Sequence, residues 1–129
     1  MTVVHLDTDV LVWGCSRPGA ERTRLFEIVD AGDVLVMSAW AWYEFRRGPR
    51  TPEQLAAAQV LLGDEGVMPV FAEVAESAAE VFRSLGSPRG RAADILIGVS
   101  AVVAGAALLT RNARDFAGIS DLRLEVVGG

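Results

Sequence analysis

The sequence has no lysine, one cysteine and one histidine in its 129 residues. Because Cys15 stands alone, a disulfide framework and a thiolate metal site are both excluded within one chain, and a reducing cytoplasmic setting is expected. The single histidine, His5, lies inside an apolar segment, which predicts a core or sheet position rather than a catalytic base. Gly-rich phosphate loops and serine-hydrolase elbows are also missing. The sequence therefore shows no catalytic site built on a common nucleophile and no metal site built on soft ligands.

Long apolar runs are limited too. Residues 95–109 carry no charge, but this run is shorter than the ~20 residues that a membrane-spanning helix needs. His5, Asp7 and Asp9 interrupt the N-terminal apolar segment, unlike the core of a signal peptide. We therefore expect a soluble protein without membrane association. The 51% hydrophobic content and positive mean hydropathy exclude disorder, and the length predicts one domain over residues 1–129.

The net charge of −5 and the sequence pI of about 4.8 argue against a generic nucleic-acid binder. All 12 basic residues are nevertheless arginines. A codon bias towards GC-rich DNA accounts for arginine without lysine equally well. Several arginines still lie close in sequence to the acids considered below, namely Arg46, Arg47, Arg50, Arg89, Arg91, Arg111 and Arg114.

Short apolar runs typical of strands alternate with longer periodic patterns typical of helices. Strands are predicted at residues 3–6, 33–37, 67–70, 106–110 and 122–127. Helices are predicted just after the first strand, at residues 21–31, 39–47, 53–62 and 72–85, and around Asp94. This alternation favours an α/β fold, with a central parallel sheet of about four or five strands and helices on both faces.

Asp94 is a charged residue at a position where the cost of burying charge would disfavour one. It stands at the start of a segment filled almost entirely by Ala, Val, Leu and Ile, and a helix that is apolar all round is a buried helix. An ionised carboxylate left unpaired in a dry core costs several kcal/mol or more. Something must therefore compensate the charge of Asp94.

Three further acids lie near predicted strand ends. Asp7 comes directly after the first strand, Asp115 lies just beyond residues 106–110, and Glu44 lies shortly after the second strand. Ligands of open parallel sheets bind outside the carboxyl ends of the strands. These three acids and Asp94 can therefore converge at one edge of the sheet.

Carboxylates held together repel and raise one another's pKa values. One or two Mg²⁺ or Mn²⁺ ions would resolve the conflict, because these hard cations prefer carboxylate oxygen. A metal site of acids alone suits phosphoryl chemistry, in which a metal activates water and steadies the leaving oxygen. Two simpler interpretations stay open: Thr8 or Asp9 as only a helix N-cap, and Glu44 as only a solvated helix residue.

Four segments carry a resemblance to a known family. They read LDTDVL at residues 6–11, YEFRRG at 43–48, DILI at 94–97 and LTRNARDF at 109–116. In their order and spacing the chain resembles the PIN-domain ribonucleases, and in size and layout the VapC-type toxins of toxin–antitoxin pairs. The last segment is the most specific of the four, and the resemblance covers essentially the whole chain.

The resemblance implies a PIN fold and a metal-dependent endoribonuclease. Mg²⁺ or Mn²⁺ would be held chiefly by Asp7 and Asp94, and the remaining catalytic and metal-binding acids would be Glu44 and Asp115. Thr110 and Asn112 would orient these acids by hydrogen bonding. Asp9 departs from the Asn often found at its position in the family and adds a negative charge near the metal.

The resemblance also implies three partners: an RNA substrate, a second copy of the chain in a homodimer, and an antitoxin whose C-terminal segment covers the acidic cleft. An acidic ribonuclease must still attract phosphate. Besides the metals, a local positive field would come from Arg46, Arg47, Arg111 and Arg114. For each arginine, the alternative is a solvated side chain or a salt bridge to an acid.

Two other functions fit parts of the sequence. The segment around Asp7 and Asp9 also resembles the first motif of haloacid-dehalogenase-type phosphatases, but those enzymes usually need a lysine to stabilise the phosphoryl intermediate. A catalytically silent PIN-like module that only binds a partner is the second alternative, against which the presence of all four acids speaks.

Overall fold

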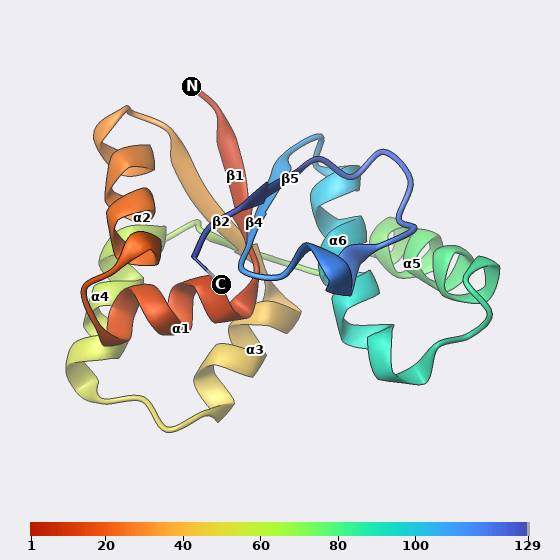
Figure 1. Cartoon of the computed structure of the whole chain (residues 1–129), viewed down its shortest axis with the longest axis horizontal. Coiled ribbons are helices and arrows are strands. Elements are labelled where there is room, and N and C mark those ends of the chain that lie inside the picture. The colour runs from red at the N-terminus through yellow and green to blue at the C-terminus, as the bar shows by residue number, and fades with distance from the viewer. Residues whose placement is uncertain (129) are drawn as a thin grey trace.

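The computed structural model of the protein describes residues 1–128, and its centre is a parallel β-sheet (Figure 1). Within these residues five strands are arranged in the order β3-β2-β1-β4-β5, and every pairing is parallel. The predicted α/β fold is therefore confirmed. The strands are β1 (Val3–Leu6), β2 (Val34–Ser38), β3 (Val67–Met68), β4 (Ala107–Thr110) and β5 (Leu124–Val126).

The helices that connect these strands agree closely with the predicted ranges. The α-helices of the described residues are α1 (Thr8–Ser16), α2 (Ala20–Asp30), α3 (Ala39–Arg47), α4 (Pro52–Leu62), α5 (Ala72–Ser84) and α6 (Ala92–Val103). Two short 3-10 helices are added, η1 (Arg89–Arg91) and η2 (Ala113–Phe116). Across residues 1–128, none of these helices has the length and apolar character that crossing a bilayer requires.

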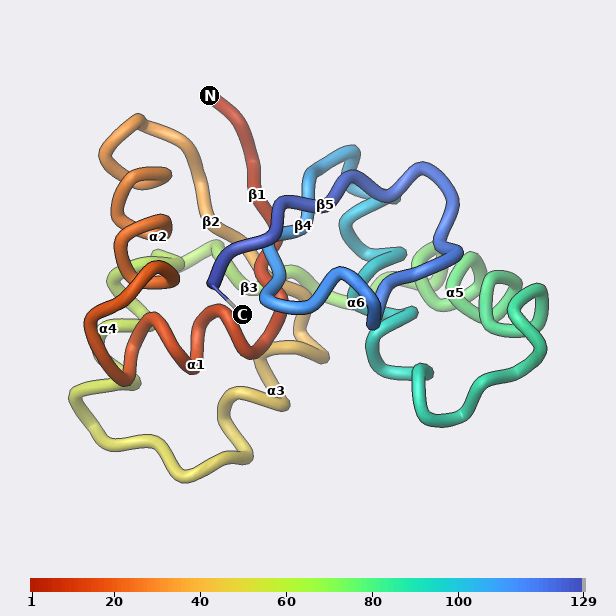
Figure 2. Tube along the Cα trace, in the orientation of Figure 1, coloured from red at the N-terminus to blue at the C-terminus, as the bar shows by residue number. Residues whose placement is uncertain are grey.

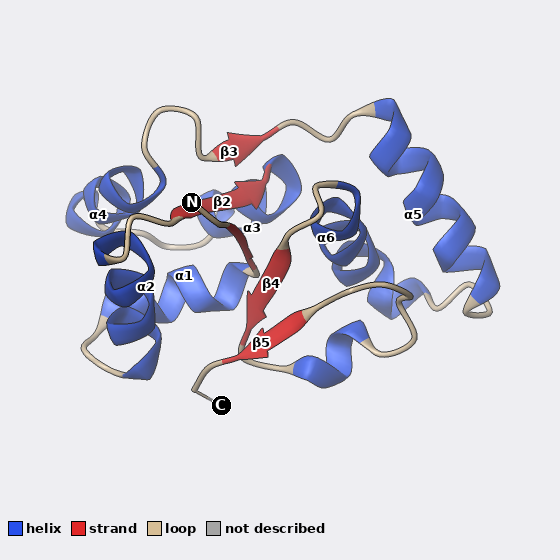
Figure 3. Ribbon diagram, turned by 90° about the horizontal axis from the view of Figure 1, so that it is seen from above, coloured by secondary structure: helices blue, strands red, loops and turns tan. Residues whose placement is uncertain are grey.

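The sheet is covered on both faces, as predicted. Figure 3 shows α1, α2 and α4 on one side of the sheet and α5 and α6 on the other. Helix α3 lies at the carboxyl edge of the strands, where it contacts both α1 and α6. It starts directly after β2 because the Ser38 hydroxyl accepts a hydrogen bond from the Ala41 N–H at 3.2 Å. This immediate strand-to-helix turn keeps Glu44 close to the edge of the sheet.

The order of the strands creates a switch point beside β1. From β1 the chain first builds β2 and β3 on one side, and it then returns to place β4 and β5 on the other (Figure 2). The ladder between β1 and β4 continues past the end of β1, because the Asp7 N–H donates to the Leu109 carbonyl at 2.9 Å. Asp7 therefore stands at the carboxyl end of the central strand, the usual place for a ligand in such sheets.

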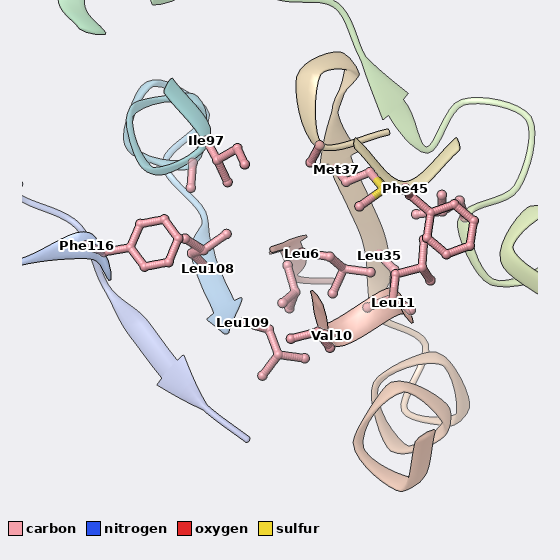
Figure 4. Packing of buried hydrophobic residues seen from close by; sticks show 14 of the residues in the cluster. Leu6, Val10, Leu11, Leu35, Met37, Phe45, Ile97, Leu108, Leu109 and Phe116 are labelled. Carbon is pink, nitrogen blue, oxygen red and sulfur yellow. The ribbon is translucent and has the colours of Figure 1, made fainter. Parts of the chain in front are cut away.

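The core is formed by aliphatic side chains of the central strands and of the helices that cover them. Leu6, Leu35, Leu108 and Leu109 of three neighbouring strands are essentially inaccessible to solvent. Figure 4 shows them packed among α1, α3 and α6 side chains, including Phe45. The apolar stretch after Asp94 thus forms a core helix, as its composition predicts.

Two strands are shorter than predicted. β3 ends at Met68 rather than residue 70, because Pro69 has no N–H to donate to a ladder. β5 covers Leu124–Val126 rather than residues 122–127. Both strands lie at the edges of the sheet. An edge strand pairs with one neighbour only, so fewer ladder hydrogen bonds hold its ends in the extended conformation.

Replacing Phe45 by Ala is expected to lower the free energy of unfolding by about 3–5 kcal/mol, because the lost ring leaves a cavity in the core. Phe45 is fully buried, whereas Phe26 on α2 is 52% exposed. Phe26→Ala is therefore the matched control, with a much smaller expected loss. Urea titrations followed by circular dichroism measure both. Equal losses in the two variants would contradict the described packing.

Candidate active site

A pocket at the carboxyl edge of the sheet brings together the four predicted acids. Asp7 precedes α1, Glu44 lies on α3, Asp94 on α6 and Asp115 on η2, and all four line this pocket. The remaining lining residues are Thr8, Asp9, Val12, Arg47 and Arg50. Acids that are far apart in the sequence therefore meet at one place, and two arginines stand beside them. We call this place the acidic pocket.

Asp7 is buried and held by two hydrogen bonds. Its Oδ1 accepts from the Thr8 N–H at 2.8 Å, and its Oδ2 accepts from the Thr110 hydroxyl at 2.9 Å. Burial raises the pKa of Asp7 to about 6, with a smaller contribution from the negative charges of Asp9 and Glu44, while the two hydrogen bonds oppose the shift. The carboxylate is thus fixed in orientation and yet short of positive charge.

The N-cap of α1 is Asp7. The alternative that Thr8 or Asp9 serves as this cap is therefore wrong, because the helix begins one residue earlier, directly at the end of β1. Asp9 lies exposed in the first turn of α1 and lines the acidic pocket. Thr8 instead uses its side chain to bind another acid.

That acid is Glu44, whose two carboxylate oxygens have different neighbours. Oε1 accepts from the Thr8 hydroxyl at 2.7 Å, and Oε2 lies 3.7 Å from Nη2 of Arg47. Glu44 is therefore more than a solvated helix residue. Sequence reasoning missed the role of Thr8, although a hydroxyl directly after the strand-end acid was the available signal.

Thr110 and Asn112 link Asp7 to the segment that carries Asp115. The Thr110 hydroxyl, besides donating to Asp7, accepts from the Asn112 N–H at 3.1 Å. The Asn112 side chain then accepts from the Arg114 N–H at 3.2 Å and caps η2. Thr110 thus orients an acid directly, whereas Asn112 shapes the turn that presents Asp115.

Asp94 lies in the first turn of α6 and is half-buried. Its pKa is raised to about 7, first by burial and then by repulsion from Asp7, Asp115 and Glu44. Arg91 lowers it in part. The charge of Asp94 is thus compensated only in part, by Arg91, which the sequence placed close to the acids without assigning it a role.

The four predicted RNA-binding arginines occupy different places. Arg47 lines the acidic pocket. Arg46 is exposed and lies over Trp42, with 5.8 Å from Cζ to the ring centroid, and Arg114 is exposed on η2. Arg111 is engaged elsewhere: its Nε donates to Oε2 of buried Glu21 at 3.0 Å, and its Cζ lies 4.1 Å from the centroid of the Trp13 ring.

Arg50 also lines the acidic pocket, although it was not among the predicted site residues. Its Nε donates to the Phe45 carbonyl at 3.0 Å, and its guanidinium lies 4.9 Å from the Phe45 ring centroid. These contacts orient the side chain from the linker that follows α3. Sequence reasoning had placed Arg50 near the acids without assigning it a role.

The donor set suits a hard divalent cation. Within residues 1–128 no three His, Cys, Asp or Glu side chains are grouped closely enough to form a ready-made metal cage. Mg²⁺ does not need one, because it commonly binds one or two carboxylates and keeps several waters. Burial and the neighbouring carboxylates both raise the pKa values of Asp7 and Asp94, and a bound cation would offset both effects. By chemistry, these residues therefore fit Mg²⁺ or Mn²⁺.

Comparison with known proteins identifies the family. The chain belongs to the PIN domain family, whose model matches residues 4–122. No curated protein matches the chain. The family match leaves the phosphatase alternative without support.

Several solved toxin–antitoxin structures share the fold. A chain of VapBC2 from Rickettsia felis, crystallised with a DNA fragment from its promoter, has a TM-score of 0.78 at 20% identity over 97% of this chain and 98% of that one. DNA-bound VapBC from Salmonella typhimurium gives 0.75 at 21% identity over 98% of both chains. VapBC-1 from nontypeable Haemophilus influenzae gives 0.68 at 23% identity over 97% and 98%.

Replacing Asp94 by Asn should stabilise the metal-free protein increasingly as pH rises from about 4 to about 7. Folded Asp94 keeps its proton up to about pH 7, while the unfolded chain releases it near the usual 3.8. The folded state therefore binds more protons in this window, so wild-type stability falls as pH rises. Asn removes that loss.

Thermal melts in EDTA across this pH window measure the effect. The comparison must use the difference between wild type and variant, because His5 contributes with the opposite sign: burial lowers its pKa to about 4. Asp30→Asn, at an exposed position of α2, is the control and should follow wild type. A difference between wild type and Asp94→Asn that stays constant with pH would contradict the assignment.

Proposed function

We propose that this protein is a metal-dependent endoribonuclease and the toxin of a toxin–antitoxin pair. The observation that carries the proposal is the acidic pocket, where carboxylates from four separate segments meet at the carboxyl edge of the sheet beside two arginines. The PIN family supports a nuclease, and the raised pKa values of Asp7 and Asp94 support a bound cation.

Asp7 and Asp94 would be the principal ligands of Mg²⁺ or Mn²⁺, with Glu44 and Asp115 completing the catalytic and metal-binding set. When bound, such a cation polarises a phosphoryl oxygen and lowers the pKa of water. Thr110 holds Asp7 and Thr8 holds Glu44 in the orientations described above. Removing either hydroxyl would leave its acid free to turn away from the pocket.

Arg47 and Arg50 would bind the phosphates of the RNA on either side of the cleaved bond. Both residues line the acidic pocket, and arginine forms strong charge-assisted hydrogen bonds with phosphate oxygens. Arg46 and Arg114 are exposed and remain candidates for more distant phosphates. Arg111 would act chiefly through its ion pair with Glu21.

An antitoxin is the proposed protein partner. The structural relatives named above come from toxin–antitoxin complexes, and this chain has an apolar groove between α1, α2 and α4 that would suit a second protein. Its lining includes Phe26, 52% exposed, and Val60, 83% exposed. In the proposed complex, the C-terminal segment of the antitoxin would cover the acidic pocket.

A homodimer and a domain that extends over residues 1–129 are also proposed. Exposed Trp40 and Tyr43 on α3, with ring centroids 5.4 Å apart, would suit a contact between two copies. The family model matches only to residue 122, but β5 pairs with β4 beyond that point and completes the sheet.

The Asp94→Asn variant should lose RNA cleavage while remaining folded. Loss of a direct ligand should exceed the roughly 10- to 100-fold effect of removing an indirect one. The assay uses end-labelled total tRNA and a panel of structured RNAs in Mg²⁺, Mn²⁺ or EDTA, with Asp30→Asn as the matched control. Full activity of a folded, metal-supplied Asp94→Asn protein would overturn the site. Silence of the wild type on every RNA would favour the binding module.

The two classes of arginine should differ in the salt dependence of RNA binding. Arg47→Ala and Arg50→Ala should each reduce the slope of log affinity against log salt by about 1, because each removes one phosphate contact. Arg111→Ala should leave the slope unchanged, because its guanidinium is paired with Glu21. Fluorescence anisotropy in EDTA, where no cleavage is expected, measures these slopes. A reduced slope for Arg111→Ala alone would reverse the assignment.

A further inference from the structure

Arg91 joins the start of α6 to the segment that carries Asp115. It is the last residue of η1 and directly precedes α6. Its Nη2 donates to the Asp115 carbonyl at 3.4 Å and also to the carbonyl of Ala117. Both carbonyls lie at the carboxyl end of η2, where helical carbonyls lack partners within the helix. Arg91 therefore satisfies this end of η2 from a neighbouring element.

The other end of η2 is held independently. The Asn112 side chain caps it by accepting from the Arg114 N–H, and the Asn112 N–H is bound to the Thr110 hydroxyl that also holds Asp7. Consequently η2 is tied at its start to the last residue of β4, and at its carboxyl end to the entry of α6. Figure 2 shows this short segment beside α6, with which it packs.

The position of the Arg91 guanidinium favours a structural role over contact with a substrate. The residue is half-buried, and its Nε is the one buried side-chain nitrogen or oxygen without a hydrogen-bond partner in residues 1–128. It does not line the acidic pocket, unlike Arg47 and Arg50. Its hydrogen bonds run to main-chain carbonyls, whose positions depend on the path of the chain around Asp115.

We infer that Arg91 is a positioning residue that fixes the segment bearing Asp115 relative to the first turn of α6, which bears Asp94. This role rests on the proposed function, because its consequence is the spacing of two acids that would share a divalent cation. Without Arg91, the carboxyl end of η2 keeps the packing of Phe116 in the core but loses its hydrogen bonds to the entry of α6, and Asp115 shifts relative to Asp94. The cation should then bind more weakly even in the absence of RNA.

The positive charge of Arg91 offers a competing explanation, since it also attenuates the repulsion around Asp94. Arg91→Lys separates the two. Lysine keeps the charge, but its ammonium ends a shorter and more flexible stem, whereas the planar guanidinium directs Nη2 of Arg91 at both carbonyls from a fixed orientation. If position matters, lysine should not restore cation binding.

Mn²⁺ titration of RNA-free protein, followed by the electron paramagnetic resonance of unbound Mn²⁺, tests the role. Arg91→Ala and Arg91→Lys should both weaken Mn²⁺ binding about 10- to 100-fold, as loss of an outer hydrogen bond to a ligand segment commonly does. Arg89→Ala, at an exposed arginine of the same η1 turn, is the matched control and should bind as wild type does. Circular dichroism checks that each variant is folded.

The outcomes separate the two proposals. Failure of wild type to bind Mn²⁺ would overturn the cation site and with it the role of Arg91 towards that site. Binding by wild type together with unchanged binding by both Arg91 variants would overturn the role of Arg91 alone. Full restoration by lysine would assign the effect to charge and likewise overturn positioning. If Arg91→Ala fails to fold, Arg91→Lys decides the question.

Discussion

The hydrogen bond from the Thr110 hydroxyl to Asp7 connects the parts of the structure on which the site depends. Asp7 ends the central strand and caps α1, while Thr110 ends β4 and begins the turn towards η2. One carboxylate thus fixes the join between two neighbouring strands and the direction of the first helix. If this carboxylate turned away, the start of α1 and the turn that presents Asp115 would no longer be joined by hydrogen bonds to the same side chain.

The arrangement of charge around this bond opposes stability and supports binding. Asp7 and Asp94 are more costly to ionise than isolated acids because they are buried near one another and near Glu44. The surrounding arginines relieve this cost only in part: Arg47 lies near Glu44, and Arg91 near Asp94. The burial and mutual repulsion that raise these pKa values also make the ionised carboxylates costly to the fold.

Much of the fold could be predicted from the sequence because it depends on local patterns. The alternation of apolar strands with periodic helices predicted the parallel sheet, and the uncharged segment after Asp94 predicted a core helix. The four acids could be found for the same reason, since each stands beside an apolar element where a charge needs an explanation. Their meeting in one pocket then followed from the geometry of parallel strands.

The supporting contacts could not be predicted in this way. The bonds of Thr8 to Glu44 and of Arg91 to the carbonyls at the carboxyl end of η2 join residues that no sequence pattern relates. Arginines show the difficulty most clearly, because their sequence neighbourhood says little about the reach of a long side chain. Arg111 lies within the most specific motif and yet pairs with Glu21, while Arg50, in a linker, lines the pocket.

The separation of 103 residues between Asp7 and Thr110 has a consequence for a chain that is still being synthesised. β1 emerges first, but its neighbour β4, the hydroxyl that holds Asp7 and the segment with Asp115 all come in the last quarter of the sequence. A nascent chain therefore carries Asp7 and Glu44 long before it has the residues that complete their surroundings. A chain that ends before β4 therefore lacks both the hydroxyl that orients Asp7 and the fourth acid of the pocket, so the acidic pocket is completed only when the chain is almost finished.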